Sequence, residues 1–248
     1  MDLGRQGRSA IVLGASQGMG LAIAEALAVE GANVAMFARR GDVVERETAR
    51  IGALGVQGDL TAAADLGRLA TATVAAFGGI DILVLNGGGP PPGKATDVDA
   101  ASALAAVELL LVPHIRLVAH CLPHLRASGR GRIIAIESTS VKEPLANLAL
   151  SNAVRPGVVG WLKTLARELG PDGITVNTIA PGRIDTERLR SIYGPEGPSA
   201  EVLAQIPVRR VGTPAEVAAT ACFLASSHAA YVTGAIVPVD GGLLNGLS

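Results

Sequence analysis

Glycines cluster directly after the first apolar run of the chain, in the segment Gly14-Ala-Ser-Gln-Gly18-Met-Gly20. Between a strand and a helix, glycines permit a tight turn, and the backbone N–H groups at the helix N-terminus can then bind a pyrophosphate. The spacing therefore predicts a dinucleotide site, and the alternative is an ordinary turn between a strand and a helix. The residues expected to bind the phosphates are Gly14, Ser16, Gln17, Gly18, Met19 and Gly20.

The second apolar run ends in two arginines, Arg39 and Arg40, about 20 residues beyond the glycine turn. An acidic residue at this place would bind the ribose 2′-hydroxyl of NAD, whereas a guanidinium binds a 2′-phosphate through paired hydrogen bonds. The two arginines therefore favour NADP(H) as the cofactor. The alternative is that both are solvated surface residues.

The elements that must position these residues follow from the hydrophobic pattern, in which short apolar runs alternate with longer amphipathic stretches. The alternation predicts an α/β fold: a single-domain, Rossmann-like, doubly wound parallel sheet of about seven strands with helices on both faces, over residues 1–248. Residues 183–207, interrupted by glycines and prolines, are expected to form a mobile substrate lid. The expected strands are Ala10–Leu13, Val34–Phe37, Ile82–Leu85, Ile133–Ile136, Val176–Ile179 and Ile236–Val239, with a weaker candidate at Val56–Leu60.

Composition restricts the class of partner. The chain has 21 lysines and arginines against 22 aspartates and glutamates and no clustered basic run, so we expect a small-molecule partner, no nucleic acid and no membrane. The apolar stretch Ile11–Val29 carries Gln17, Glu25 and three glycines, and is neither a membrane span nor a signal peptide. Cys121 and Cys222 lie in apolar helical segments, where thiols are usually buried hydrophobes, so a reducing, cytoplasmic setting is expected.

Further segments follow the glycine turn in a consistent order: Asp59-Leu60, Asn86-Gly87-Gly88-Gly89, Pro181-Gly182 with Thr186, Arg210–Glu216, and the closing Val239-Asp-Gly-Gly242. With them the chain resembles the short-chain dehydrogenase/reductase family, particularly its 3-oxoacyl-carrier-protein reductases, over nearly its whole length. The resemblance implies cofactor contacts from Asp59, Leu60, Asn86, Gly87, Gly88, Pro181, Gly182, Ile184 and Thr186. It also implies a homotetramer or homodimer formed through the helices around Leu104–Leu122 and Val158–Leu169.

The same resemblance implies a catalytic tetrad of Asn, Ser, Tyr and Lys, of which only the serine is kept, as Ser138. Ser151 and Arg155 stand at the positions of the family's tyrosine and lysine, and Leu110 stands at that of its asparagine. A serine hydroxyl is a poor acid, and an arginine stays charged and cannot cycle a proton. The family's usual way of protonating the alkoxide left by hydride transfer therefore cannot operate unchanged.

Three hypotheses follow. In the first, the protein reduces a ketone, quinone or enone whose charge is delocalised after hydride transfer, water supplies the proton, and Ser138 and Arg155 stabilise the oxyanion. In the second, another side chain is the acid, and the candidates are Lys142, four residues after Ser138, and His114. In the third, the chain binds NADP(H) without catalysis, as a sensor or subunit, because a fold does not fix a function.

Three local expectations concern neighbours of these residues. Glu137 should point away from Ser138, because side chains alternate along a strand, and should be exposed or salt-bridged. Pro156 lacks the N–H of a helix interior, so a helix should begin or kink there. His120 and His124 have a spacing that suits a metal, but no further ligands complete a site and no metal is expected.

Overall fold

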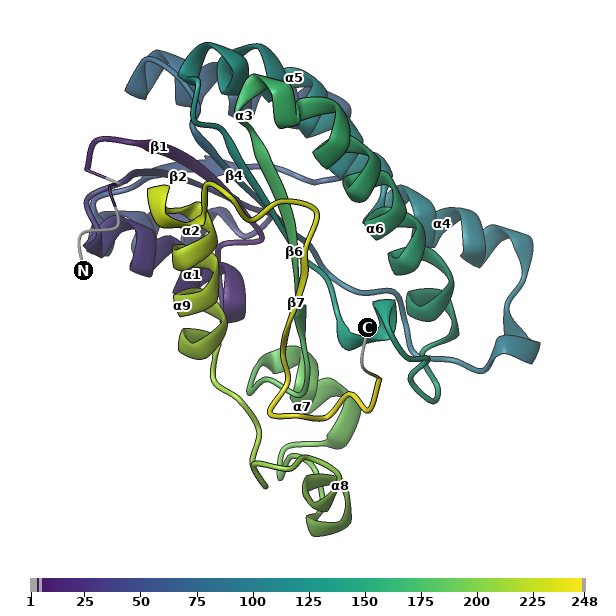
Figure 1. Cartoon of the computed structure of the whole chain (residues 1–248). Coiled ribbons are helices and arrows are strands. Elements are labelled where there is room, and N and C mark those ends of the chain that lie inside the picture. The colour runs from purple at the N-terminus through teal and green to yellow at the C-terminus, as the bar shows by residue number, and fades with distance from the viewer. Residues whose placement is uncertain (1–3, 5, 247–248) are drawn as a thin grey trace.

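Seven apolar runs of the chain form one parallel sheet in this computed structural model, which describes Gly4 and residues 6–246 (Figure 1). The strand order is β3-β2-β1-β4-β5-β6-β7, and every neighbouring pair is parallel. The expected fold class and number of strands are confirmed. The strands are β1 (Ser9–Leu13), β2 (Asn33–Ala38), β3 (Leu54–Gln57), β4 (Ile82–Asn86), β5 (Arg132–Ile136), β6 (Thr175–Pro181) and β7 (Ile236–Val239).

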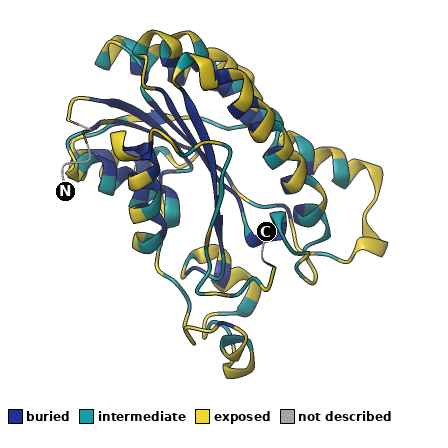
Figure 2. Cartoon of the chain, in the orientation of Figure 1, coloured by how far each residue is buried: buried dark blue, intermediate teal, exposed yellow. Residues whose placement is uncertain are grey.

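Helices cover both faces of this sheet (Figure 1). Residues of β1 alternate between two cores: Ile11 and Leu13 pack with α3, α5 and α6, whereas Ala10 and Val12 pack with α1 and α9. Figure 2 shows the resulting buried strands between helices whose outer sides are exposed. The helices are α1 (Gly18–Val29), α2 (Gly41–Ile51), α3 (Ala63–Phe77), α4 (Ala100–Leu110), α5 (Val112–Ser128), α6 (Ala149–Leu169), α7 (Glu187–Tyr193), α8 (Ala200–Ala204) and α9 (Pro214–Ala225), with 3-10 turns at Ala95–Asp97, Thr139–Val141, Gly170–Asp172 and Ser227–Ala229.

The sequence placed the weakest strand too late in the chain. The expected strand was Val56–Leu60, whereas β3 ends at Gln57. Beyond that point the carboxylate of Asp65 accepts a hydrogen bond from the Asp59 amide at 2.9 Å, and the Asp59 carboxylate accepts one from the Thr61 amide at 2.9 Å. These local bonds turn the chain away from the sheet into α3.

Residues 183–207 leave the sheet after β6 and carry α7 and α8, which lie beyond its carboxyl-terminal edge (Figure 1). Arg183 ties this segment together, because its guanidinium donates to the Tyr193 hydroxyl at 3.1 Å and to the Gln205 side chain at 2.9 Å. The lid function and its mobility remain predictions.

The helical run Ala100–Ser128, which joins α4 and α5, is long and apolar enough to cross a membrane by length and composition. The core helix of a water-soluble protein passes the same test, so one such run is weak evidence for a span, and a third of its most apolar window is buried in this fold. Leu104 and Ile115 on its outer side are 68% and 40% exposed. The association of copies through these helices remains a prediction.

The expected helix start at Pro156 is wrong, because α6 is assigned without a break from Ala149 to Leu169. Contacts before Pro156 hold the first turn in place. The Asn152 side chain accepts from the Leu145 amide at 3.0 Å and donates to the Leu145 carbonyl at 2.8 Å, and Gly93 accepts from the Ala149 amide at 3.2 Å. These bonds, together with the burial of one side of the helix, stabilise it by more than the loss of the one hydrogen bond that Pro156 cannot donate.

Replacing Pro156 by alanine should stabilise the protein. The new N–H can donate to the Asn152 carbonyl, so we expect Pro156→Ala to raise the free energy of unfolding by about 1–3 kcal/mol in chemical denaturation. Pro113→Ala is the matched control, since Pro113 lies in the first turn of α5, where an N–H has no intrahelical partner. A gain in the control but not in Pro156→Ala would contradict this interpretation.

Candidate active site

The glycine turn between β1 and α1 has a backbone that larger residues could not adopt. Gly14 and Gly18 have φ angles of +60° and +56°. A Cβ on Gly20 would lie 2.3 Å from the Gly14 carbonyl oxygen, which no side chain tolerates. The Asn86 amide at the end of β4 donates to the Leu13 carbonyl at 3.1 Å and so fixes the turn to the neighbouring strand. The predicted turn is therefore present, with its backbone open to a phosphate.

The two arginines after β2 lie beside the same turn. Arg40 donates a hydrogen bond to the side chain of Gln17, and hydrogen bonds from Thr61, followed by the positive charge of Arg39, lower the pKa of Asp59. Both arginines are exposed, and within the described residues neither has a carboxylate within salt-bridge distance. The structure thus brings Arg39 and Arg40 close to Gln17 and Asp59. Because no described carboxylate forms a salt bridge with either arginine, an anion could bind there.

Segments distant in sequence complete the same cleft. A Cβ on Gly18 would lie 3.3 Å from the Thr186 side chain, and one on Gly87 would lie 3.6 Å from Leu60. Gly182 stands against the backbone of Asp240, where a Cβ would approach to 2.8 Å. These contacts bring the segments after β1, β3, β4, β6 and β7 together outside the carboxyl ends of the strands, where a doubly wound sheet has its dinucleotide cleft, so the residues fit a dinucleotide.

The remaining predicted cofactor residues differ in their surroundings. Ser16 is half-buried, Met19 packs against the core under α1, and Ile184 is buried, with a bridge to Gly212. Pro181 ends β6 and Gly88 follows β4. Pro181 and Ile184 are therefore buried, whereas Ser16 brings a partly exposed hydroxyl to the glycine turn.

A buried guanidinium lies at the inner end of this cleft. Arg155, 9% exposed, donates from Nη1 to the Glu137 carboxylate at 2.8 Å, from Nε to the Ser151 hydroxyl at 3.1 Å, and from Nη2 to the Gly88 carbonyl at 3.2 Å. The Ser151 hydroxyl also lies 3.2 Å from that of Ser140. Helix α6, the end of β5 and the loop after β4 therefore meet at one side chain.

The direction of these hydrogen bonds is fixed by chemistry. A guanidinium can only donate, so the Ser151 oxygen accepts from Arg155, and the one Ser151 proton points to Ser140 or to a bound ligand. The Ser138 oxygen likewise accepts from the Ser140 amide at 3.1 Å, which leaves its own proton for a ligand. Ser138 is half-buried and Ser151 is 6% exposed, so the cluster has one partly accessible and one buried hydroxyl.

Glu137 belongs to this cluster, which the sequence did not predict. The expected salt bridge is present, but the expectation of a carboxylate away from the site is wrong, since Glu137 is 5% exposed and pairs with Arg155. Alternation along β5 does not apply, because the strand ends at Ile136. Burial raises the pKa of Glu137, and Arg155 opposes that rise.

The structure argues against one of the two candidate proton donors, His114, whereas Lys142 stays a prediction. His114 is 3% exposed, and burial together with the charge of Arg155 lowers its pKa to about 3, so it is neutral near pH 7 and its Nδ1, 4.0 Å from Glu137, forms no ion pair. Lys142 follows the 3-10 turn Thr139–Val141, and its amine forms no hydrogen bond or salt bridge with any described residue. Histidine works as a general acid when its pKa lies near the working pH, so His114 is excluded from that role.

Several features of the site had little or no signal in the sequence. Ser140 and the Gly88 carbonyl belong to the cluster only because the chain folds back on itself. Leu110, at the position of the family's asparagine, ends α4 as a buried apolar residue. Among the described residues, no group of three or more His, Cys, Asp or Glu is placed to hold a metal ion.

The burial of His114 predicts a pH-dependent stability. The unfolded chain binds a proton on His114 near its ordinary pKa of 6.5, whereas the folded chain binds it only near about 3, so the folded state loses stability as the pH falls below about 6.5. In His114→Gln this contribution is absent. The slope of the free energy of unfolding between pH 6.5 and 5 should then be smaller than in the wild type by up to about 1.4 kcal/mol per pH unit.

Urea denaturation at several pH values measures these slopes. His120→Gln is the control, because the exposed His120 side chain stays in water on folding. Equal slopes in the wild type and in His114→Gln would show that His114 is not held neutral by burial.

The chain is similar to known proteins over nearly its whole length. A sequence family described as enoyl-(acyl carrier protein) reductase matches residues 14–244. The 3-oxoacyl-[acyl-carrier-protein] reductase MabA of Mycobacterium tuberculosis is 35% identical over 236 residues, which is 95% of this chain and 92% of that protein. The cyclohexanol dehydrogenase of a Rhodococcus species is 35% identical over 98% of both chains. The structure of the L-sorbose reductase of Gluconobacter frateurii, complexed with NADPH and L-sorbose, superposes with a TM-score of 0.94 at 32% identity over the whole of both chains.

Proposed function

The chain belongs to the short-chain dehydrogenase/reductase family, and on this basis we propose that it is an NADPH-dependent reductase of a conjugated ketone, quinone or enone. The observation that carries the proposal is the pair of hydroxyls, Ser138 and Ser151, beside a buried arginine at the inner end of a dinucleotide cleft. The relatives named above are oxidoreductases by name, which supports an enzyme rather than a binding protein alone.

The cofactor is NADP(H), as the two arginines after β2 indicate and as the NADPH complex of the sorbose reductase supports. Arg39 and Arg40 would hold the 2′-phosphate, the glycine turn would hold the pyrophosphate, and Thr186 would lie by the nicotinamide. When bound, this cofactor supplies a hydride. The protein must then orient the substrate and stabilise the charge that forms on its oxygen.

Ser138 and Ser151 would donate hydrogen bonds to the substrate oxygen. Arg155 strengthens Ser151 as a donor, because a guanidinium at 3.1 Å polarises the hydroxyl whose oxygen accepts its N–H. At least three of the five Arg155 N–H groups are already used on the protein, so Arg155 is better suited to position Ser151 than to bind the oxyanion itself. This revises the sequence-based hypothesis, which gave Arg155 the oxyanion.

The type of substrate follows from the absence of a suitable acid among the described residues of the cluster. A serine hydroxyl does not protonate a localised alkoxide efficiently, and the buried His114 has a pKa of about 3. In an enone or quinone, hydride addition leaves an enolate or phenolate, whose charge is delocalised and which water can protonate later. Two hydrogen bonds suffice to stabilise such an anion, so conjugated carbonyl compounds fit the site better than simple ketones.

Cofactor choice can be tested directly. Arg39→Leu and Arg40→Leu should each raise the Kd of NADPH by about 10- to 100-fold and leave that of NADH unchanged, because only NADPH carries the 2′-phosphate. Fluorescence titration measures both constants. Arg46→Leu is the matched control, as Arg46 is exposed on α2 and paired with Glu47. A parallel loss of NADH affinity would indicate damage to the turn instead.

Catalysis can be tested by NADPH consumption with a panel of simple ketones, quinones and enones. Ser138→Ala and Ser151→Ala should each lower kcat by about 100-fold while NADPH binding persists, because each removes one donor to the developing anion. Ser140→Ala is the comparison, since its hydroxyl contacts that of Ser151 but is given no hydrogen bond to the substrate in this proposal, and a smaller loss is expected. Tight NADPH binding without turnover of any compound would favour a non-catalytic NADP(H)-binding protein.

A further inference from the structure

A second arginine, Arg188 of α7, contacts the same loop as Arg155 of α6, namely the loop after β4. Its Nη2 donates to the Pro90 carbonyl at 2.8 Å, whereas Arg155 donates to the Gly88 carbonyl two residues earlier. Between them, a Cβ on Gly89 would lie 3.3 Å from the Arg188 guanidinium, so the missing side chain makes room for it. Two guanidinium groups thus contact one short loop at the inner end of the cleft, one from the core and one from the lid segment.

Only one of these two cations has a counter-ion. Arg155 pairs with Glu137, but Arg188 forms no salt bridge with any described residue. Its neighbour Arg190 is different, since it pairs with Asp185 at 2.7 Å.

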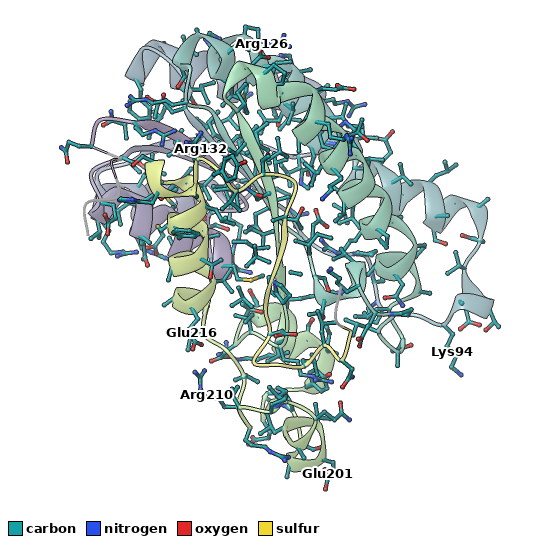
Figure 3. The ribbon with its side chains drawn as sticks, in the orientation of Figure 1. Lys94, Arg126, Arg132, Glu201, Arg210 and Glu216 are labelled. Atoms are coloured by element: carbon teal, nitrogen blue, oxygen red, sulfur yellow. The ribbon has the colours of Figure 1, made fainter. Side chains whose placement is uncertain are left out.

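Other cations near the loop do not share this environment. Lys94 is exposed and points outward from the loop before α4 (Figure 3). Arg210, on the far side of α7 and α8, pairs with Glu216 at the start of α9 (Figure 3). Arg188 therefore differs from Lys94, because it is directed at the loop, and from Arg210, because it forms no salt bridge with a described residue.

The Arg188 guanidinium lies near the positive charge of Arg155. Partial burial, and then the charge of Arg155, lower the pKa of its guanidinium. One hydrogen bond to the Pro90 carbonyl uses one of five donors, so the others can form the paired bonds that a carboxylate accepts. Although its guanidinium is partly buried, the Arg188 residue as a whole is exposed, so a ligand can reach it.

We propose that Arg188 binds a carboxylate of the substrate, so that the reduced compound is an oxo acid rather than a neutral ketone or enone. This inference rests on the proposed reductase function and names its substrate class. Glu137 pairs with Arg155 and so keeps Arg155 beside Ser151, where the substrate carbonyl would react. Arg188, on the lid segment, would bind the carboxylate end of the substrate. Binding of the anion would also fasten α7 to the loop after β4.

The test compares a carboxylate with its neutral analogue on the NADP⁺-loaded protein, in which no reduction occurs. The probes are 4-oxo-4-phenylbutanoate and 4-oxo-4-phenylbutanamide, titrated by calorimetry at millimolar concentration. The wild type should bind the carboxylate at least about 10-fold more tightly, and Arg188→Leu should abolish that preference with little change for the amide. Arg190→Leu removes the same charge from the same helix and should keep the preference.

Three results would overturn the proposal: no binding of the carboxylate, equal affinity of the wild type for both probes, or the same preference in Arg188→Leu. A rise in the Kd of NADP⁺ in Arg188→Leu, with the preference for the carboxylate unchanged, would instead assign Arg188 to the cofactor phosphates and overturn it too. Turnover separates this inference from the proposed function. Reduction of neutral enones without a preference for charged substrates would support the reductase and contradict the carboxylate site. Preferential binding of the carboxylate without turnover of any compound would support the carboxylate site and contradict the reductase.

Discussion

The guanidinium of Arg155 is buried, and this constraint organises the inner end of the cleft. A charge removed from water must have its donors satisfied and its charge balanced, because an unpaired buried ion costs several kcal/mol. Glu137, Ser151 and the Gly88 carbonyl meet that requirement from three different elements. The positions of α6, of the end of β5 and of the loop after β4 therefore depend on one another.

This arrangement also explains how the chain can keep a reductase scaffold without the tyrosine and lysine that the family resemblance implies. Arg155 cannot release a proton, but its fixed N–H makes Ser151 an acceptor on one side and a polarised donor on the other. A buried ion pair is seldom more stabilising than apolar residues of similar volume. Its presence is better understood as a means of holding the Ser151 hydroxyl in place.

The cofactor end and the substrate end are built on different principles. At the glycine turn the constraint is steric: Gly20 approaches the Gly14 carbonyl so closely that only hydrogen fits, and the backbone itself becomes the binding surface. At the loop Gly88–Pro90 the constraint is electrostatic, with two cations and one carboxylate. The first is common to dinucleotide sites.

The sequence by itself determined the parallel sheet, the glycine turn and the arginines after β2, because these depend on local periodicity and on residue types at short spacing. It misplaced β3 and the start of α6, where side-chain bonds from Asp65 and Asn152 override local preference. It identified Ser138, Ser151 and Arg155 through the family resemblance, and it expected Glu137 to be exposed or salt-bridged but to point away from Ser138. Only the tertiary structure decided that Glu137 balances Arg155, that His114 is neutral and that Arg188 is not balanced, since charge compensation depends on which distant side chains meet.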